Sequence, residues 1–340
     1  MVLLNGRHGS PSGSWLCFHQ DIGQDIGQDI GQDIESCRDE TRDIRREPVD
    51  RGGVVRVEVR AGDGRRIVAE DWGDPGGLPV LLHHGTPGSR LGTALGDITE
   101  RCPGIRFFAY DRPGYGDSDR ARGRTVADAA ADSAAVADAL GLDTFAVVGR
   151  SGGGPHALAC AALLPERVTG TAALVSLAPW GGAGLDWFAG MTAHNAEHYA
   201  LAARDPAALE RRLTPRAAAI GSDPGRLLEE LRAQLSEADL PVISDPDVHR
   251  ALMDGYREAL RTSAYGWLDD SLAFCRPWGF DPGSIPGRVL LWHGAEDAFS
   301  PLGHFRWLAG HIDRSTAVLK PGAGHFAAQY AQPEALEWLL

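Results

Sequence analysis

A serine stands at the centre of a glycine-rich stretch in the middle of the chain. Gly149-Arg-Ser-Gly-Gly153 fits the pattern G-x-S-x-G, with Ser151 in its middle. An apolar, β-branched run precedes the pattern and an Ala- and Leu-rich run follows it, which predicts a strand that turns directly into a helix. Such a turn strains its central residue and needs small neighbours, as Gly149 and Gly153 are. We interpret Ser151 as a nucleophile; the alternative is a glycine-rich turn with an incidental serine.

Two later loops carry the residue types that could activate this serine. A serine hydroxyl is a poor nucleophile at neutral pH, so it needs a base whose tautomer a carboxylate fixes. His325 lies in the stretch Gly322-Ala-Gly-His-Phe326, directly after an expected strand. Glu296 and Asp297 are neighbours in a loop that follows an earlier apolar run. Serine, acid and histidine in this chain order are expected for a triad at the carboxyl ends of parallel strands.

A third loop could stabilise the negative charge that forms during acyl transfer. His83-His-Gly-Thr-Pro-Gly-Ser-Arg90 follows another short apolar run. The backbone N–H groups of Thr86 and Gly152 would together form a pair of donors for an oxyanion. We interpret His84 as a structural partner of this loop. The alternative is a simple turn without a functional role.

The segments around these loops alternate between strand and helix patterns. Apolar or alternating runs predict strands at residues 54–59, 66–72, 78–84, 105–110, 144–149, 168–177, 288–292 and 316–319. Besides the helix after Ser151, helical patterns occur at residues 125–140, 301–310 and 332–340. This alternation predicts an α/β fold with a mostly parallel sheet covered by helices on both faces.

Residues 180–280 interrupt that alternation. They contain helical patterns and no strand pattern, with helices expected at 193–204, 206–219, 225–238, 247–260 and 263–274. We interpret them as a helical cap over the carboxyl edge of the sheet, inserted between core segments 51–179 and 281–340. The cap contains bulky apolar side chains, among them Trp187, Met191, Tyr256 and Trp267. We expect some of them to face the substrate, so that the cap sets substrate choice without supplying chemistry.

Residues 1–50 differ from the rest of the chain. Gln-Asp-Ile occurs four times between residues 20 and 34, with Gly between the copies. Gly at every fourth position costs a helix roughly 1 kcal/mol each relative to Ala, and four isoleucines bury little area. We interpret this segment as a low-complexity, disordered extension. The alternatives are a helical interaction arm and a protein that begins later, near Val49 or Val54.

The bulk properties restrict partners and location. The formal net charge of the 340 residues is −13, which disfavours nucleic acid and anionic membranes as partners. No apolar run reaches the ~18 residues of a membrane span, and the amino terminus lacks the pattern of a secretion signal. The five cysteines show no metal-binding spacing. We therefore expect a cytoplasmic protein that acts on a small molecule, with no cofactor and no metal.

In combination, the motifs resemble those of the α/β-hydrolase fold family, over about residues 54–340. The stretches that carry the resemblance are His84-Gly-Thr-Pro, Asp111-Arg-Pro-Gly-Tyr-Gly-Asp-Ser118, Gly149-Arg-Ser-Gly-Gly153, His293-Gly-Ala-Glu-Asp297 and Gly324-His-Phe. The resemblance implies that Ser151 is the nucleophile and His325 the base. It favours Asp297 as the acid, because the family's acid stands four residues before a proline, here Pro301. It also implies that residues 111–118 shape the loop beneath the pocket without taking part in the chemistry.

The function implied by this resemblance is that of a cofactor-free serine hydrolase. Its substrate would be a carboxylic ester of a small or medium hydrophobic compound, cleaved through an acyl-enzyme intermediate. Ser151 argues against dehalogenases and epoxide hydrolases, whose nucleophile is Asp. One alternative is an aminopeptidase or amidase of the proline iminopeptidase-like type, which Gly152 and Thr86-Pro87 fit less well. Another is a lyase or a ligand-binding member of the fold, although binding alone requires no triad.

Overall fold

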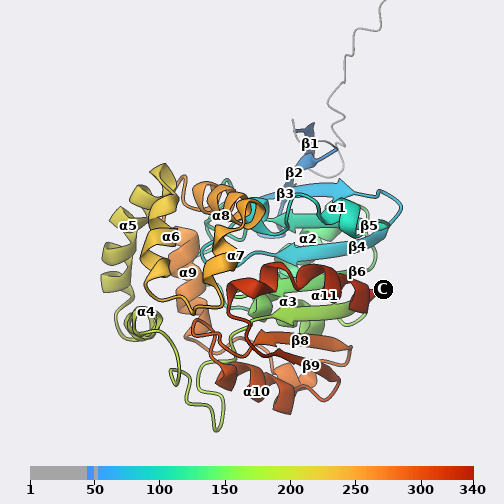
Figure 1. Cartoon of the computed structure of the whole chain (residues 1–340). Helices are drawn as coiled ribbons and strands as arrows, with labels where there is room; N and C mark the ends of the chain where they lie inside the picture. The colour runs from blue at the N-terminus through green and yellow to red at the C-terminus, as the bar shows by residue number, and fades with distance from the viewer. Residues whose placement is uncertain (1–43, 50–52) are drawn as a thin grey trace, which may run out of the picture. The chain divides into compact units, whose positions relative to one another are not determined.

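The computed structural model describes residues 44–49 and 53–340, so the interpretation of residues 1–43 as a disordered extension lies outside the described residues. The strands of this part of the chain form one sheet in the order β1-β2-β3-β5-β4-β6-β7-β8-β9 (Figure 1). They are β1 (Arg45–Pro48), β2 (Val55–Arg60), β3 (Arg66–Gly73), β4 (Leu78–His83), β5 (Ile105–Tyr110), β6 (Phe145–Arg150), β7 (Val168–Leu174), β8 (Val289–Gly294) and β9 (Ser315–Lys320).

The strands from β5 across the sheet to β9 are parallel, and the register of their pairs aligns their carboxyl ends. His83 at the end of β4 lies opposite Gly149 of β6, and Arg150 at the end of β6 lies opposite Leu174 of β7. Leu174 in turn lies opposite Trp292 of β8. The loops that follow these strands therefore start at nearly the same level of the sheet. This register brings together loops that are far apart in the chain.

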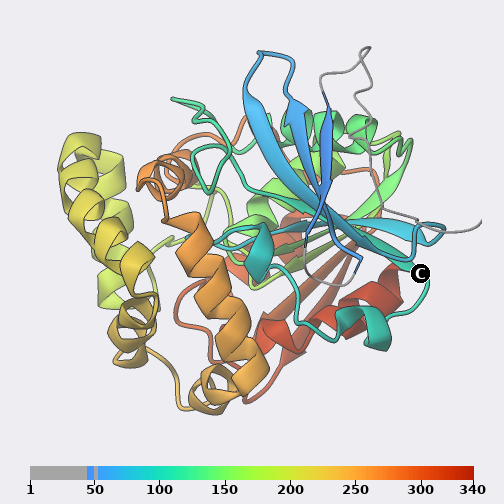
Figure 2. The ribbon, with the colours of Figure 1, turned by 90° about the horizontal axis from the view of Figure 1, so that it is seen from above.

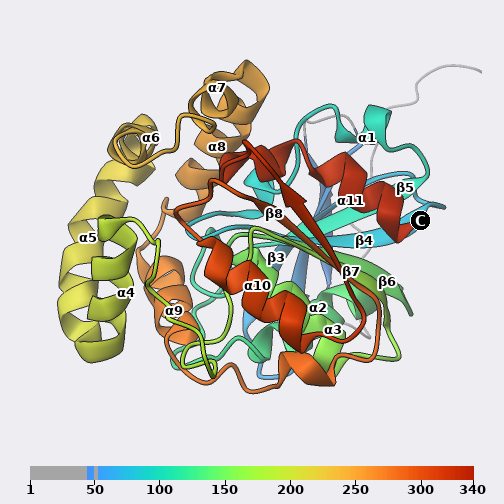
Figure 3. The same cartoon turned by 60° about the horizontal axis from the view of Figure 1, so that its bottom comes forward.

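Helices cover both faces of the sheet, as the alternation of patterns predicts. Helices α2 (Asp128–Ala139), α3 (Gly153–Leu163) and α10 (Leu302–His311) pack on one face, and α1 (Ile98–Arg101) and α11 (Gln332–Leu339) on the other (Figure 3). Buried strand residues alternate between the two faces, because successive side chains of a strand point to opposite sides. The predicted α/β class is confirmed.

The helical insertion is also confirmed. It consists of α4 (Ala193–Arg204), α5 (Pro206–Ser222), α6 (Gly225–Arg232), α7 (Leu240–Ser244), α8 (Pro246–Ala259) and α9 (Tyr265–Phe274). These helices lie beside the carboxyl ends of the parallel strands (Figures 1 and 2). Asp205 and Asp245 cap α5 and α8, each followed by a proline at the first helical position. Helix α6 ends at Arg232, six residues before the predicted end at 238, and the chain then turns to place Asp239.

The amino-terminal boundary of the core differs from the predicted residue 50. Residues Arg45–Pro48 form β1, which pairs antiparallel with β2 from Arg45 opposite Glu58 to Pro48 opposite Val55. The Arg46 guanidinium also donates to the carbonyl of Ala139, at 2.7 Å. A short, charged edge strand carries no apolar alternation, because backbone pairing rather than a buried face holds it. None of the helices in the described part of the chain is long and apolar enough to cross a membrane.

Candidate active site

Ser151 occupies a tight turn between β6 and α3. Its φ angle is +56°, a left-handed conformation that is strained for a residue with a side chain. A Cβ atom on Gly149 would lie 2.2 Å from the carbonyl oxygen of Gly153, and one on Gly153 would lie 2.3 Å from that of His83. Both positions therefore require glycine. The strand, turn and helix that the sequence pattern predicts around Ser151 are present.

The structure brings Ser151, His325 and Asp297 into one chain of hydrogen bonds. The Nε2 atom of His325 lies 3.0 Å from Oγ of Ser151, and its Nδ1 atom lies 2.8 Å from Oδ2 of Asp297. When Nδ1–H donates to the carboxylate, Nε2 carries the lone pair and accepts from the serine hydroxyl. The three side chains come from the loops after β6, β8 and β9. This arrangement can remove a proton from Ser151.

Glu296 and Asp297 have different surroundings, which decide which of the two acids contacts His325. Oδ1 of Asp297 accepts from the backbone N–H groups of Phe299 and Ser300, at 2.8 and 2.9 Å. Burial alone would raise the pKa of the Asp297 carboxyl, but His325, His293 and the N–H of Ser300 together outweigh burial and hold the pKa below its usual value. Glu296 is exposed, whereas Asp297 is buried. Asp297 is thus the acid in contact with His325.

The backbone N–H groups of Thr86 and Gly152 are available to a bound oxygen. Residues Thr86 and Gly152 adjoin, since a Cβ atom on Gly152 would lie 2.3 Å from Oγ1 of Thr86. Neither of these N–H groups donates to another group in the part of the chain that the structure describes. Gly152 is also the N-cap residue of α3, where the helix dipole favours negative charge. The pair can therefore stabilise an oxyanion beside Ser151.

A buried carboxylate from the cap holds the Thr86 loop, and the sequence reasoning missed it. Asp270 of α9 accepts from Oγ1 of Thr86 at 2.6 Å and pairs with Arg112 and Arg124, each at 2.6 Å. Burial raises the pKa of Asp270, but the two guanidinium groups outweigh burial and hold the pKa well below its usual value. The sequence signal for Asp270 was the presence of an acidic residue inside an otherwise apolar helical pattern.

Arg112 connects the same carboxylate to the loop that contains His84. Its guanidinium donates to the carbonyls of His84 and Gly85, at 2.5 and 2.9 Å, and its backbone N–H donates to Nε2 of His84. Nδ1 of His84 bonds the carbonyl of Gly85 at 2.8 Å, so both ring nitrogens are engaged within the loop. His84 is a structural partner of this loop, as the sequence analysis proposes.

A second carboxylate from the cap holds the histidine loop. Asp239, which precedes α7, accepts from the backbone N–H groups of His325 and Phe326, at 3.1 and 2.7 Å. Its side chain is buried, and a Cβ atom on Gly324 would lie 2.3 Å from its carboxyl carbon. No sequence pattern indicates this contact, because the partners of Asp239 are backbone groups that any residue could provide.

Two small cavities meet at Ser151. One, the Arg150 cavity, has a volume of about 60 Å³ and includes Ser89, Arg150, Leu252, Tyr256 and Phe326 in its lining. The other, the cap cavity, has a volume of about 80 Å³ and includes Leu177, Asn195, His198, Arg216, Trp267 and Phe299. Ser151, Thr86, Tyr256 and His325 line both. A substrate with its carbonyl at Ser151 can therefore extend in two directions.

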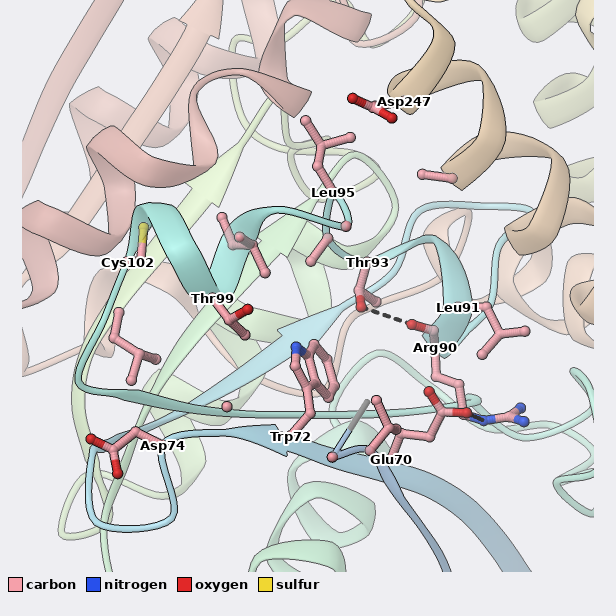
Figure 4. A pocket seen from close by; sticks show the side chains of 18 of the residues that line it. Glu70, Trp72, Asp74, Arg90, Leu91, Thr93, Leu95, Thr99, Cys102 and Asp247 are labelled. Carbon is pink, nitrogen blue, oxygen red and sulfur yellow. Dashed lines mark hydrogen bonds and ion pairs between the residues drawn. The ribbon is translucent and has the colours of Figure 1, made fainter. Parts of the chain in front are cut away.

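Residues of the helical turn η1 (Arg90–Gly92) and of α8 line part of a larger cavity of about 750 Å³ (Figure 4). Trp72, Glu70 and Arg90 line it, and no residue of the hydrogen-bonded triad does. Arg90 is held there by Glu70 at 3.1 Å, by Glu258 at 2.9 Å and by Asp111. The chemistry-bearing residues therefore lie in the two smaller cavities. Among the described residues no group of three or more His, Cys, Asp or Glu side chains could hold a metal ion.

Comparisons with known proteins agree with this geometry. A sequence model of the alpha/beta hydrolase fold matches residues 79–329. A non-heme chloroperoxidase of Streptomyces lividans is 40% identical over 123 residues, and a bifunctional esterase/perhydrolase of Acinetobacter calcoaceticus is 32% identical over 122 residues. Each match covers 36% of this chain and 44% of the relative, so less than half of either relative is spanned. A malate-bound thermophilic esterase from Thermogutta terrifontis superposes with a TM-score of 0.60 at 25% identity, covering 84% of this chain and 96% of that one.

Proposed function

Because the chain belongs to the α/β-hydrolase fold family, we propose that it is a serine hydrolase that cleaves a carboxylic ester of a small or medium hydrophobic substrate. The observation that carries the proposal is the continuous hydrogen-bonded chain from Asp297 through His325 to Ser151. Ser151, at one end of this chain of hydrogen bonds, lies beside the backbone N–H groups of Thr86 and Gly152, which donate to no other group among the described residues. The esterases among the similar proteins give the proposal independent support.

Acylation begins when Nε2 of His325 takes the proton of the Ser151 hydroxyl. Oγ then bonds to the ester carbonyl carbon, and the carbonyl oxygen, now negative, accepts from the N–H groups of Thr86 and Gly152. The bond from carbon to the alcohol oxygen breaks, and His325 returns its proton to the departing alkoxide. The products of this step are the free alcohol and an acyl group on Ser151.

Deacylation repeats the same sequence with water as the nucleophile. His325 takes a proton from water, the resulting hydroxide attacks the acyl carbon, and Ser151 leaves with the proton that His325 returns. Asp297 stabilises the positive charge on His325 in both halves of the reaction. Because Asp297 also accepts two backbone N–H groups, its orientation is fixed before substrate binds.

A second candidate is transfer of the same acyl group to hydrogen peroxide. The names of the Streptomyces and Acinetobacter relatives, a chloroperoxidase and an esterase/perhydrolase, favour this candidate. Hydrogen peroxide would replace water in deacylation, and the product would be a peroxy acid. Ester hydrolysis and perhydrolysis share the acyl-enzyme, so they differ only in the acceptor.

Covalent labelling by a fluorophosphonate tests the proposal directly. We expect one label per chain, located on Ser151 by peptide mass spectrometry, and turnover of acyl esters in preference to aminoacyl amides. Ser151→Ala should abolish labelling and lower kcat about 10⁶-fold without a change in melting temperature. Residual activity within tenfold of wild type would overturn the proposal. Addition of hydrogen peroxide to the same assay separates peroxy acid formation from hydrolysis.

A further inference from the structure

Arg150 lies directly before Ser151 in the chain, and no carboxylate among the described residues pairs with its guanidinium. Its Nη2 atom donates to the carbonyl of Gly92 at 3.1 Å. With its amide oxygen turned toward the guanidinium, Gln329 accepts from Nη1 and Nη2 at 3.1 and 3.2 Å. These acceptors are neutral, and they fix the position of Arg150 without balancing its charge.

The buried arginines near the site, unlike the half-buried Arg150, are all paired with carboxylates. Arg90 contacts three acids, and Arg112 and Arg124 share Asp270. By contrast, no Asp or Glu in the described ranges 44–49 and 53–340 forms an ion pair with Arg150. A buried charge is costly unless it is paired, and a guanidinium cannot lose its proton at physiological pH. Arg150 is thus an exception among these arginines, and a bound anion would supply the negative partner that its guanidinium lacks.

Arg150 and Ser151 line the same cavity. Arginine has five N–H donors, and the bonds to Gly92 and Gln329 leave the Nε–H and one N–H of Nη1 without a partner among the described residues. The cavity lining contains no Asp or Glu. Burial raises the pKa of the Tyr256 phenol in the same lining to about 12, so this group stays neutral and can donate a hydrogen bond.

We propose that the Arg150 cavity binds a carboxylate of the substrate, so that the preferred ester is an anionic one. This inference rests on the proposed function and specifies its substrate class. The carboxylate would pair with the free N–H groups of Arg150 while the ester carbonyl sits at Ser151. The cavity volume of about 60 Å³ suits a group as small as a carboxylate. The apolar part of the substrate then extends into the cap cavity.

Arg216 in the cap cavity provides a matched control. Its guanidinium pairs with Glu230 at 2.5 Å and contacts Nε2 of His194 at 3.1 Å, so its charge is already balanced. Each of the two arginines lines a cavity that Ser151 also lines, and of the two it is Arg150 that lacks a carboxylate partner in the described structure. Replacement of the two by the same residue therefore separates a general loss of positive charge from loss of the proposed contact.

The test compares esters with a carboxylate to isosteric esters with an amide. Monomethyl succinate and methyl succinamate place the group on the acid side, and acetoxyacetate and acetoxyacetamide place it on the alcohol side. We expect kcat/KM of wild type to favour the anionic member of one pair by about 10- to 100-fold, the range of a charge-assisted hydrogen bond. The favoured pair identifies the side on which the carboxylate lies.

Arg150→Gln should reduce that ratio to about threefold or less, Arg150→Lys should keep part of it, and Arg216→Gln should keep all of it. A merely structural role of Arg150 would lower turnover of both esters and leave their ratio unchanged, which would overturn the inference. Equal turnover of both members of each pair by wild type would overturn it without any variant. Turnover of other acyl esters with none of these four cleaved would overturn this inference alone, whereas absence of both fluorophosphonate labelling and ester turnover would overturn the proposed function.

Discussion

The carboxylate of Asp239 accepts the backbone N–H group of His325 at 3.1 Å, although the two residues lie 86 positions apart in the chain. Asp239 belongs to the cap and His325 to the core, so the cap holds the loop that carries the proposed base. Asp270, also from the cap, holds the Thr86 loop in the same way. The expectation that the cap sets substrate choice without supplying chemistry stays a prediction, since neither carboxylate contacts Ser151. The cap also positions two of the loops around Ser151.

Replacement of Asp239 should slow catalysis although it touches no reacting atom. Asp239→Asn places an amide group among backbone donors, which leaves an N–H of His325 or Phe326 without an acceptor at a cost of about 1–3 kcal/mol. We expect kcat to fall about 10- to 100-fold with a smaller change in KM. Glu237→Gln, at an exposed position two residues earlier, is the control. A loss of melting temperature with an unchanged kcat would show that Asp239 serves stability alone.

The sequence predicted the parts of the site that depend on local patterns. Ser151 and its glycines were recognisable because a strand, a tight turn and a helix follow one another in the chain. Asp297 was separable from Glu296 only by the resemblance to a family, since both acids stand in the same loop. Asp239 was not recognisable, because its partners are backbone groups, and the acid at Asp270 in an apolar pattern did not reveal its partners, which the tertiary fold brings together. Edge strand β1 was missed because its charged residues are held by backbone pairing.

Exchange of the two neighbouring acids for amides tests the assignment of Asp297. Asp297→Asn should present the wrong hydrogen-bonding group to His325, favour the wrong tautomer and lower kcat about 10³- to 10⁴-fold. Glu296→Gln changes an exposed side chain and should stay within about twofold of wild type. Steady-state kinetics on one ester suffices for both variants. If Glu296→Gln is the more damaging change, the roles of the two acids must be exchanged.

A buried histidine at the base of the cap should make stability depend on pH. Nδ1 of His304 accepts from the backbone N–H of Ala178 at 2.9 Å, and its Nε2 lies 2.9 Å from the carbonyl of Trp187. Protonation of Nδ1 would break the first bond, and burial lowers the pKa of His304 to about 4. The unfolded chain titrates near 6.5, so it binds a proton between about pH 6.5 and 4 that the folded chain does not.

The free energy of unfolding should therefore fall as the pH drops from about 6.5 to 4, with up to ~1.4 kcal/mol per pH unit from this one group. His304→Gln should flatten this part of the curve. The measurement is urea unfolding at several pH values, and the difference at pH 8 gives the cost of lost packing and hydrogen bonds without titration, because the imidazole is neutral there in both states. A slope that is identical in wild type and variant would contradict the assignment.

Substitution of two cap tryptophans, Trp267 and Trp187, distinguishes an effect on substrate choice from an effect on stability. Trp267 lines the cap cavity, where the guanidinium of Arg216 lies over its ring at 4.8 Å. Trp187 is equally buried but lines neither cavity at Ser151, and its Nε1–H donates to the carbonyl of Ala178 at 2.8 Å. Trp267→Phe enlarges the cap cavity, whereas Trp187→Phe removes a hydrogen bond and packing from the cap interior. The same substitution therefore has a different expected effect at each position.

We expect Trp267→Phe to move the preferred acyl chain toward greater length, since about 1–3 kcal/mol of discrimination accompanies each methylene that a pocket accepts or rejects. Trp187→Phe should lower the melting temperature and keep the wild-type preference, because its ring contacts other cap side chains rather than the cavity. The measurement is kcat/KM across a series of esters of increasing acyl length. If both variants keep the wild-type optimum, the cap cavity does not bind the acyl chain, and other residues around Ser151 determine the preferred acyl length.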